Sequence, residues 1–218
     1  MVHQFTFNHY EVNCYIIYHA DGGPCAIVDP GASASYEDAQ ITQFVDEHHL
    51  TPTLILITHA HVDHIAGLKP LCERYNLPAT LHSDGKKLLK QAPAYASVMG
   101  FSVPTLTDID TRFVNDGDLL DIAAGTDAAP LTIECRHCPG HCPGSLCFVL
   151  HDEKTVLTGD ALFHLSIGRA DLPGGDYDLL INQIKSKLLT LPDDYLVLPG
   201  HSITSNIGKE RLHNPFLK

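Results

Sequence analysis

A short segment of the chain carries four side chains of the types that bind transition metals. His59, His61, Asp63 and His64 fall within the six residues HAHVDH. Neutral imidazole nitrogens and carboxylate oxygens are ligands that suit Zn²⁺ and also Fe²⁺ or Mn²⁺. The apolar run Thr53–Ile57 precedes the segment and is short enough to be a buried strand. The pattern therefore predicts a metal site at the end of a strand, where rigid elements hold the ligands.

Three further candidate ligands lie downstream, and each of them follows a glycine. They are His141, Asp160 and His201. Each also follows an apolar or strand-like run, and the glycine lets the backbone turn sharply at that point. Because one short loop cannot usually complete two coordination spheres, we expect these three residues to supply further ligands.

Alternating and helical patterns place these motifs on a regular framework. In the first half we expect strands at 2–9, 14–19, 25–29, 53–57 and 79–82, and helices at 35–49, 65–75 and 84–91, with Ser35 as an N-cap. The stretch 92–118 is expected to be Pro-rich and irregular, with a helical turn near Tyr95–Met99. In the second half we expect strands at 119–122, 131–136, 145–150, 155–157 and 196–198 and a helix at 178–189. The tail 207–218 is expected to be a short helix followed by a Pro-containing end. A single domain, residues 1–218, built of two similar sheet-plus-helix layers is the simplest organisation.

The overall composition excludes several classes of protein. The 218 residues contain 14 Lys and Arg against 26 Asp and Glu, a net charge of −12. Such a charge disfavours binding to nucleic acid or to anionic membranes. No apolar run approaches the roughly 18 residues that span a bilayer, and the polar N-terminus lacks the pattern of a signal peptide. With seven cysteines, an odd number that fits reduced thiols, we expect a cytoplasmic protein.

The order of the histidine and aspartate motifs resembles that of the metallo-β-lactamase superfamily. The set H-x-H-x-D-H, G-H-x-P-G-S, G-D and P-G-H occurs in sequence, and the resemblance runs from Asp29 to His201. It implies an α/β fold, an αββα four-layer sandwich of two mixed sheets flanked by helices, with two metal ions between the sheets.

The resemblance also implies a role for each ligand. It assigns His59, His61 and His141 to one ion and Asp63, His64 and His201 to the other, with Asp160 bridging both. Two divalent ions, zinc first and iron or manganese as alternatives, would share a hydroxide that attacks the substrate. Asp63 would also orient this nucleophile as a catalytic residue.

Two further segments resemble the small bacterial-type glyoxalase II-like, or hydroxyacylglutathione hydrolase-like, hydrolases. They are FHLSIGRADLPGG at 163–175 and SITSNIGKERLHNPFL near the C-terminus. The implied reaction is hydrolysis of a thioester such as S-D-lactoylglutathione. Candidate substrate contacts in these segments are Arg169, Asp171, Lys209 and Arg211. Fuller glyoxalase II enzymes carry a helical C-terminal region that helps to bind glutathione, so the glutathione contacts stay open.

Other functions of the same family remain alternatives. A persulfide dioxygenase would use one iron held by His59, His141 and Asp160, and its last histidine motif usually reads A-H, whereas this chain has Gly200 before His201. A lactonase or another ester hydrolase, and a metal-binding scaffold without activity, are the others. Metal content discriminates: two ions favour hydrolysis, one iron favours dioxygenation, and none favours the scaffold.

Several conspicuous residues receive a more ordinary interpretation. Cys135, Cys138 and Cys142 have a spacing that could bind metal, but buried thiols are the favoured reading. The basic patch of Lys86, Lys87 and Lys90 could meet a substrate carboxylate, although a solvated helix face is favoured. Asp29 is expected to cap its Asp-Pro-Gly turn or to orient a ligand. The oligomeric state is left open.

Overall fold

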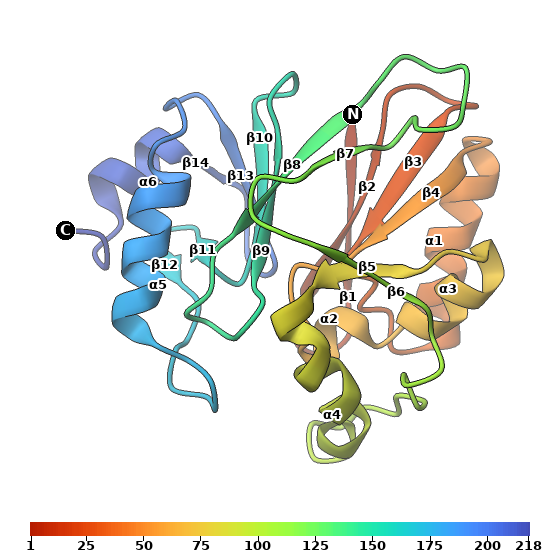
Figure 1. The fold of residues 1–218 in the computed structure, drawn as a ribbon, viewed down its shortest axis with the longest axis horizontal. Helices are drawn as coiled ribbons and strands as arrows, with labels where there is room; N and C mark the ends of the chain where they lie inside the picture. The colour runs from red at the N-terminus through yellow and green to blue at the C-terminus, as the bar shows by residue number, and fades with distance from the viewer.

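Two six-stranded sheets face each other in the computed structural model, which describes residues 1–218 (Figure 1). In the first sheet β1 to β3 pair antiparallel and β3 to β6 run parallel. Its strands, in spatial order, are β1 (Val2–Phe7), β2 (Val12–Tyr18), β3 (Pro24–Val28), β4 (Thr51–Leu56), β5 (Ala79–His82) and β6 (Thr111–Val114).

The second sheet is mixed in the same way. Its β10 and β13 pair parallel, and its other neighbours pair antiparallel. The strands are, in spatial order, β14 (Ser205–Asn206), β13 (Leu196–Pro199), β10 (Thr155–Gly159), β9 (Leu146–Leu150), β8 (Thr132–His137) and β7 (Leu119–Asp121). A separate small hairpin pairs β11 (Leu162–Phe163) with β12 (Ser166–Ile167).

Helices cover the outer face of each sheet (Figure 1). The first sheet carries α1 (Ser35–Glu47), α2 (Val62–Ile65), α3 (Leu68–Tyr75) and α4 (Lys86–Ala96), which a 3-10 turn at Ser83–Gly85 precedes. The second sheet carries α5 (Tyr177–Gln183), continued by a π-helical turn at Ile184–Leu188, and α6 (Ile207–His213). The order is helix, sheet, sheet, helix, which confirms the expected four-layer sandwich.

The burial of β2 shows that this sheet is covered on both faces. Every residue of the strand is buried. Cys14 and Ile16 pack in the cluster beneath the outer helices, while Tyr15 and Ile17 pack in the cluster between the two sheets. Because successive side chains of a strand point to opposite faces, a strand that is buried throughout must be covered on both sides.

Several boundaries differ from the sequence-based expectation. The expected helix at 65–75 is two helices, because the chain bends at Gly67, whose amide donates to Pro30 O at 2.9 Å. Ser35 is not the N-cap of α1. Ala34 holds that position, and the Glu37 carboxylate accepts the amides of Ser33 and Ala34. The stretch 92–118 contains the end of α4, which overlaps the helical turn expected near Tyr95–Met99, and strand β6, which was not expected.

The helices are all too short or too polar to cross a bilayer.

Candidate metal centre

The predicted ligands gather where strands of both sheets end. His59 and His61 follow β4, His141 lies in the loop between β8 and β9, Asp160 follows β10, and His201 follows β13. The loops that follow the carboxyl ends of β4, β10 and β13 therefore meet in one region between the sheets. This is the usual place for a site in sheets with parallel neighbours.

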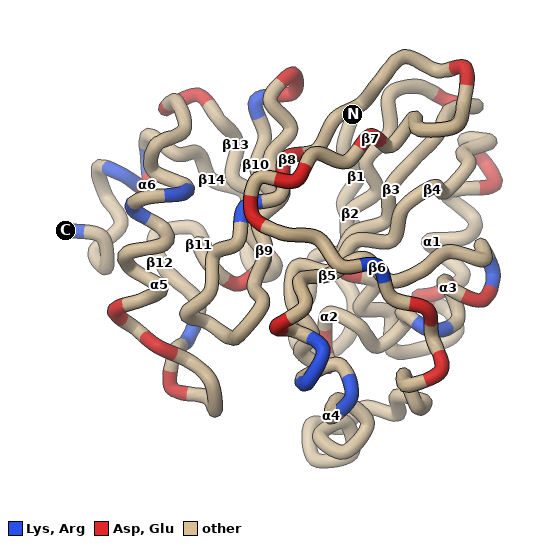
Figure 2. The backbone as a smooth tube through the Cα atoms, in the orientation of Figure 1, with Lys and Arg blue, Asp and Glu red and all other residues tan.

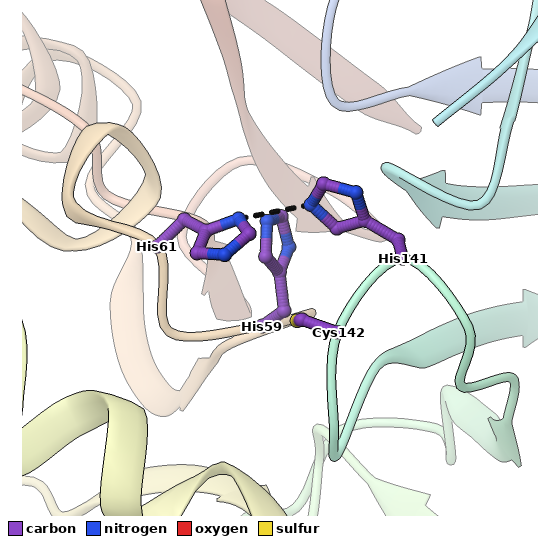
Figure 3. A group of neighbouring side chains, drawn as sticks. All are labelled: His59, His61, His141 and Cys142. Atoms are coloured by element: carbon purple, nitrogen blue, oxygen red, sulfur yellow. Dashed lines mark hydrogen bonds between the residues drawn. The ribbon is translucent and has the colours of Figure 1, made fainter. Parts of the chain in front are cut away.

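Three histidines form the first group, and their side chains point toward one another (Figure 3). Nε2 of His141 lies 2.9 Å from Nδ1 of His61. The ring centroid of His59 lies 4.7 Å from that of His61 and 4.8 Å from that of His141. The three nitrogens and the thiol of Cys142 are close enough together to surround one ion.

Asp63, His64 and His201 form the second group. Nε2 of His201 lies 3.2 Å from Oδ2 of Asp63 and 3.2 Å from Nε2 of His64. Nε2 of His64 lies 3.7 Å from the same Asp63 oxygen. Two nitrogens and one carboxylate oxygen thus converge from three directions on a second point.

The carboxylate of Asp160 lies between the two groups. Its Oδ2 is 4.0 Å from Nε2 of His59 and 3.6 Å from Nε2 of His141. Its Oδ1 is 3.4 Å from Nε2 of His64, and its Oδ2 is 3.7 Å from Nε2 of His201. One side chain is therefore in reach of ligands from both groups, as a bridging ligand must be.

Hydrogen bonds fix which nitrogen of each ring faces the site. Nδ1 of His141 donates to the carbonyl of Arg169 at 2.7 Å, and Nδ1 of His201 donates to the carbonyl of Tyr10 at 2.9 Å. Nδ1 of His64 donates to Oδ2 of Asp29 at 2.9 Å. When Nδ1 carries the proton, Nε2 is left with its lone pair, and in all three rings Nε2 is the atom that points into the site.

Asp29 also orients His59 indirectly. The amide and hydroxyl of Thr58 donate to the Asp29 carboxylate at 2.7 and 2.6 Å. Because the hydroxyl proton is committed to Asp29, the Thr58 oxygen accepts from Nδ1 of His59, which lies 3.1 Å away. Asp29 is 2% exposed and thus supports ligands of both groups from one buried position. The expectation that it orients a ligand agrees with this geometry.

The protonation tendencies of the ligands follow from burial and neighbouring charge. Burial and the neighbouring His141 lower the pKa of His61 to about 4, and burial with the surrounding histidines lowers the pKa of His59. Burial alone would lower the pKa of His64 too, but the carboxylates of Asp160, Asp63 and Asp29 outweigh it and raise that pKa. Neutral rings such as His59 and His61 are the form that binds a metal.

Two buried atoms of the site have no hydrogen-bond partner in the protein. They are Nε2 of His59 and Oδ1 of Asp160. A buried polar atom without a partner costs about 1–3 kcal/mol, so such atoms are normally satisfied. A divalent cation would satisfy both, and the donor set of imidazole and carboxylate fits it.

The predicted substrate contacts lie elsewhere and bind partners of their own. Arg169 pairs with Asp171 through two hydrogen bonds of 2.8 Å, and its carbonyl rather than its side chain serves the site. Nζ of Lys209 lies 3.5 Å from Nε2 of His164. Arg211 donates to the carbonyls of Leu189 and Leu191 and pairs with Asp193.

The three cysteines of the C-x₂-C-x₃-C segment lie in three different surroundings. Cys135 packs in the cluster between the sheets, and Cys138 packs beneath α5. Cys142 lies beside the first histidine group, with Sγ 3.3 Å from Oγ of Ser145. All three are free, buried thiols, which confirms the favoured interpretation of these cysteines.

A second cluster, His82, Asp84 and His137, was not identified from the sequence. The two imidazole rings stack with centroids 3.8 Å apart and planes 9° apart. Ring lone pairs lie in the ring plane, so stacked rings direct them side by side and not toward a common point. The arrangement therefore packs two rings and does not form a chelate.

A cavity of about 580 Å³ opens beside His61. Helix α4 and the loop 172–174 form much of its lining, together with Ala60, Val62 and Pro143. None of Arg169, Asp171, Lys209 and Arg211 lines it, whereas Lys87 does. The sequence contains one signal for this wall, the basic patch of Lys86, Lys87 and Lys90, for which a solvated helix face is the favoured interpretation.

Comparison with known proteins gives related sequences over the whole chain. The family model described as "Metallo-beta-lactamase superfamily" matches residues 8–201. The "Probable metallo-hydrolase YqgX" of Bacillus subtilis is 38% identical over 95% of this chain and 92% of its own length. The "Hydroxyacylglutathione hydrolase GloC" of Haemophilus influenzae is 34% identical over 95% of this chain and 93% of its own length.

Solved structures superpose closely. "BLEG-1 B3 metallo-beta-lactamase" is 36% identical with a TM-score of 0.87, covering 100% of both chains. "TTHA1623 in a di-iron-bound form" is 32% identical with a TM-score of 0.85, covering 99% of this chain and 100% of its own.

Proposed function

The chain belongs to the metallo-beta-lactamase superfamily, and from that premise we propose that it is a two-metal hydrolase that cleaves a thioester such as S-D-lactoylglutathione. The observation that carries the proposal is the position of Asp160, whose two carboxylate oxygens lie 3.4–4.0 Å from ring nitrogens of both histidine groups. The similarity to a hydroxyacylglutathione hydrolase supports the choice of substrate class.

Seven side chains would hold the two ions. His59, His61 and His141 would bind the first, Asp63, His64 and His201 the second, and Asp160 both. The donor set accepts zinc, iron or manganese, and a relative's structure is described as di-iron-bound. When bound, the ions supply Lewis acidity that polarises the substrate carbonyl and lowers the pKa of water.

The chain's own residues then orient the reactants. Asp63 is buried, and although burial opposes ionisation, His64 and His201 lower its pKa, so its carboxylate stays ionised and can accept a proton from the attacking water. The carbonyls of Arg169 and Tyr10 and the carboxylate of Asp29 hold the rings of His141, His201 and His64 in one tautomer. Rings fixed in this way need no reorganisation during the reaction.

Gly200 favours the hydrolase over the one-iron dioxygenase. A Cβ at this position would overlap Oδ1 of Asp160 and would lie 2.7 Å from Cε1 of His64. The glycine therefore leaves room for Asp160 to approach the second group. A dioxygenase that uses only His59, His141 and Asp160 would have no need of that approach.

Hydrolysis of a β-lactam is a second candidate. The specific observation in its favour is the 36% identity to a structure titled as a B3 metallo-beta-lactamase. A β-lactam amide and a thioester both pass through a tetrahedral oxyanion, so the same residues could serve either reaction.

The test starts from protein purified without a histidine tag. Metal content is measured by elemental mass spectrometry, and the same sample is assayed with S-D-lactoylglutathione, a chromogenic β-lactam and glutathione persulfide. Close to two ions per chain with thioester turnover is the expected result. One iron with oxygen consumption would move the function to dioxygenation, and β-lactam turnover alone would favour the second candidate. His59→Ala should abolish turnover while circular dichroism shows the fold retained.

A further inference from the structure

The cavity beside His61 is large enough to take one arm of a substrate. Its volume of about 580 Å³ lies within the roughly 300–1,000 Å³ typical of small-molecule sites. Because a metal ligand forms part of its wall, a group bound in the cavity lies next to the reacting centre. The cavity therefore selects among substrates of the proposed reaction.

Apolar side chains form half of the lining and come from both sides of the cavity. Val62, Leu88, Ala92, Met99 and Leu172 are among them. Ala92 belongs to the core cluster of the first sheet, and Leu88 and Met99 pack against that cluster. An apolar wall backed by the core is fixed in place, so it favours a substrate arm with hydrocarbon character.

Lys87 is the one lysine or arginine in this lining. No carboxylate lies within 4.0 Å of its Nζ, so no ion pair occupies it. The neighbouring lysines of α4 differ: Lys86 lies over the ring of Phe113 at 5.5 Å, and Lys90 does not line the cavity. Figure 2 shows this basic stretch at the start of α4.

The cavity has one cation too few to pair with a whole glutathione arm. A glutathione arm carries two carboxylates and one ammonium, whereas the cavity lining offers one ammonium, that of Lys87, and one carboxylate, that of Asp84. Of the three cations predicted to meet substrate, Arg169 and Arg211 are bound to Asp171 and Asp193, and Lys209 does not line the cavity. The glutathione ammonium could pair with Asp84 and one of its carboxylates with Lys87, but its second carboxylate would find no cation in this lining.

We propose that this cavity binds an apolar substrate arm that ends in a single carboxylate, and that Lys87 pairs with that carboxylate. This inference rests on the proposed thioester hydrolysis and names the substrate class within it: half-thioesters of apolar dicarboxylic acids. Gln91 and Tyr95, also in the lining, supply neutral hydrogen-bonding groups along the arm.

The experiment compares three thioesters on the metal-loaded enzyme. The suberyl thioester of N-acetylcysteamine carries one carboxylate, the octanoyl thioester carries none, and S-D-lactoylglutathione carries the glutathione arm. We expect the highest kcat/KM with the suberyl compound. Lys87→Met should lower the suberyl-to-octanoyl ratio of kcat/KM about fivefold through KM, the size of one exposed ion pair. Lys90→Met is the matched control and should keep the ratio of the wild type.

A second variant tests the cavity without touching the charge. Leu172→Trp narrows it, so the ratio of kcat/KM for octanoyl over acetyl thioester should fall. The inference would be overturned if Lys87→Met kept the suberyl-to-octanoyl ratio and Leu172→Trp kept the octanoyl-to-acetyl ratio of the wild type. A higher kcat/KM for S-D-lactoylglutathione than for the suberyl thioester would also overturn it. Either result would leave thioester hydrolysis intact. No turnover of any thioester by protein with two ions would instead reject the proposed function itself.

Discussion

Gly200 lies directly against the side chain of Asp160, and there is no room at position 200 for a larger residue. An added Cβ would overlap Oδ1 of Asp160, the oxygen that faces His64. The backbone amide of Gly200 also donates to Gly159 O at 2.8 Å, so the backbone cannot easily withdraw. The separation of these two residues thus controls whether Asp160 can serve both groups.

Gly200→Ala should therefore cost the protein its second ion. The Cβ would push the carboxylate away from His64, and we expect the metal content to fall from about two ions per chain toward one. Elemental mass spectrometry measures this directly. Gly85→Ala is a suitable control because its Cβ would meet only Leu81 Cδ1 at an ordinary 3.4 Å. Two ions bound with unchanged affinity in Gly200→Ala would contradict the prediction.

Asp29→Asn should weaken metal binding without unfolding the chain. Asp29 adopts a φ of 49°, a conformation that asparagine tolerates. The amide removes the negative charge that holds Nδ1–H of His64 and the Thr58 hydroxyl, and loss of such support typically costs about 10–100-fold in metal affinity. Competition with a chromogenic chelator gives the affinity. Asp21→Asn, which alters an exposed Asp–His48 pair of the same 2.9 Å length, should leave it unchanged.

Removal of the metals should lower the melting temperature. A ligand that binds only the folded state at about 100 times its Kd adds about 2.7 kcal/mol to the free energy of unfolding. For a chain of this size that corresponds to roughly 5–10 °C per ion. Calorimetry with and without a chelator tests this, and readdition of metal should restore the original value. Equal melting temperatures would mean that the seven residues bind no ion in the folded state.

Asp38→Asn should stabilise the protein above pH 6. Burial and the neighbouring Glu37 raise the pKa of Asp38 to about 6, above its ordinary 3.8. Between these pH values the folded state holds a proton that the unfolded state has lost, so the free energy of unfolding falls as pH rises. The asparagine variant lacks this decline.

Urea unfolding of chelator-treated protein at pH 4.5 and pH 7.5 measures the effect. The gain from Asp38→Asn should be largest at pH 7.5 and much smaller at pH 4.5, which lies near the lower end of this pH range. Glu47→Gln, at the exposed end of α1, is the control. An equal gain at both pH values would show that the effect comes from packing and not from the charge.

Local patterns of the sequence predicted most strands and the seven candidate ligands, whereas the four layers were implied by the resemblance to the superfamily. Apolar runs such as that of β4 and the motif after it are contiguous, so a strand and its ligands can be recognised together. The edge strand β6 was missed because its residues are largely exposed and lie in a Pro-containing stretch. Its pairing with β5 is decided by tertiary contacts.

The groups that hydrogen-bond to the ligand side chains and orient them could not be predicted in the same way. The Tyr10 carbonyl that fixes His201 lies 191 residues away along the chain, and the one that fixes His141 belongs to Arg169. A carbonyl is present in every residue, so its role leaves no trace in residue type. The role of Glu37 also depends on contacts between residues that are distant in the sequence. Its carboxylate caps α1 and also accepts the amide of Asn8, whose side chain donates to Asp63 O at 3.0 Å.

The position of Asp29 makes the two ion sites interdependent. One carboxylate supports His59 through Thr58 and supports His64 directly. An ion bound to either histidine would fix the orientation of this carboxylate, and a second ion would then find its ligand already aligned. Linkage would make the effect reciprocal. We therefore expect cooperative loading: in a titration with limiting metal, chains with no ion and chains with two should outnumber those that hold one.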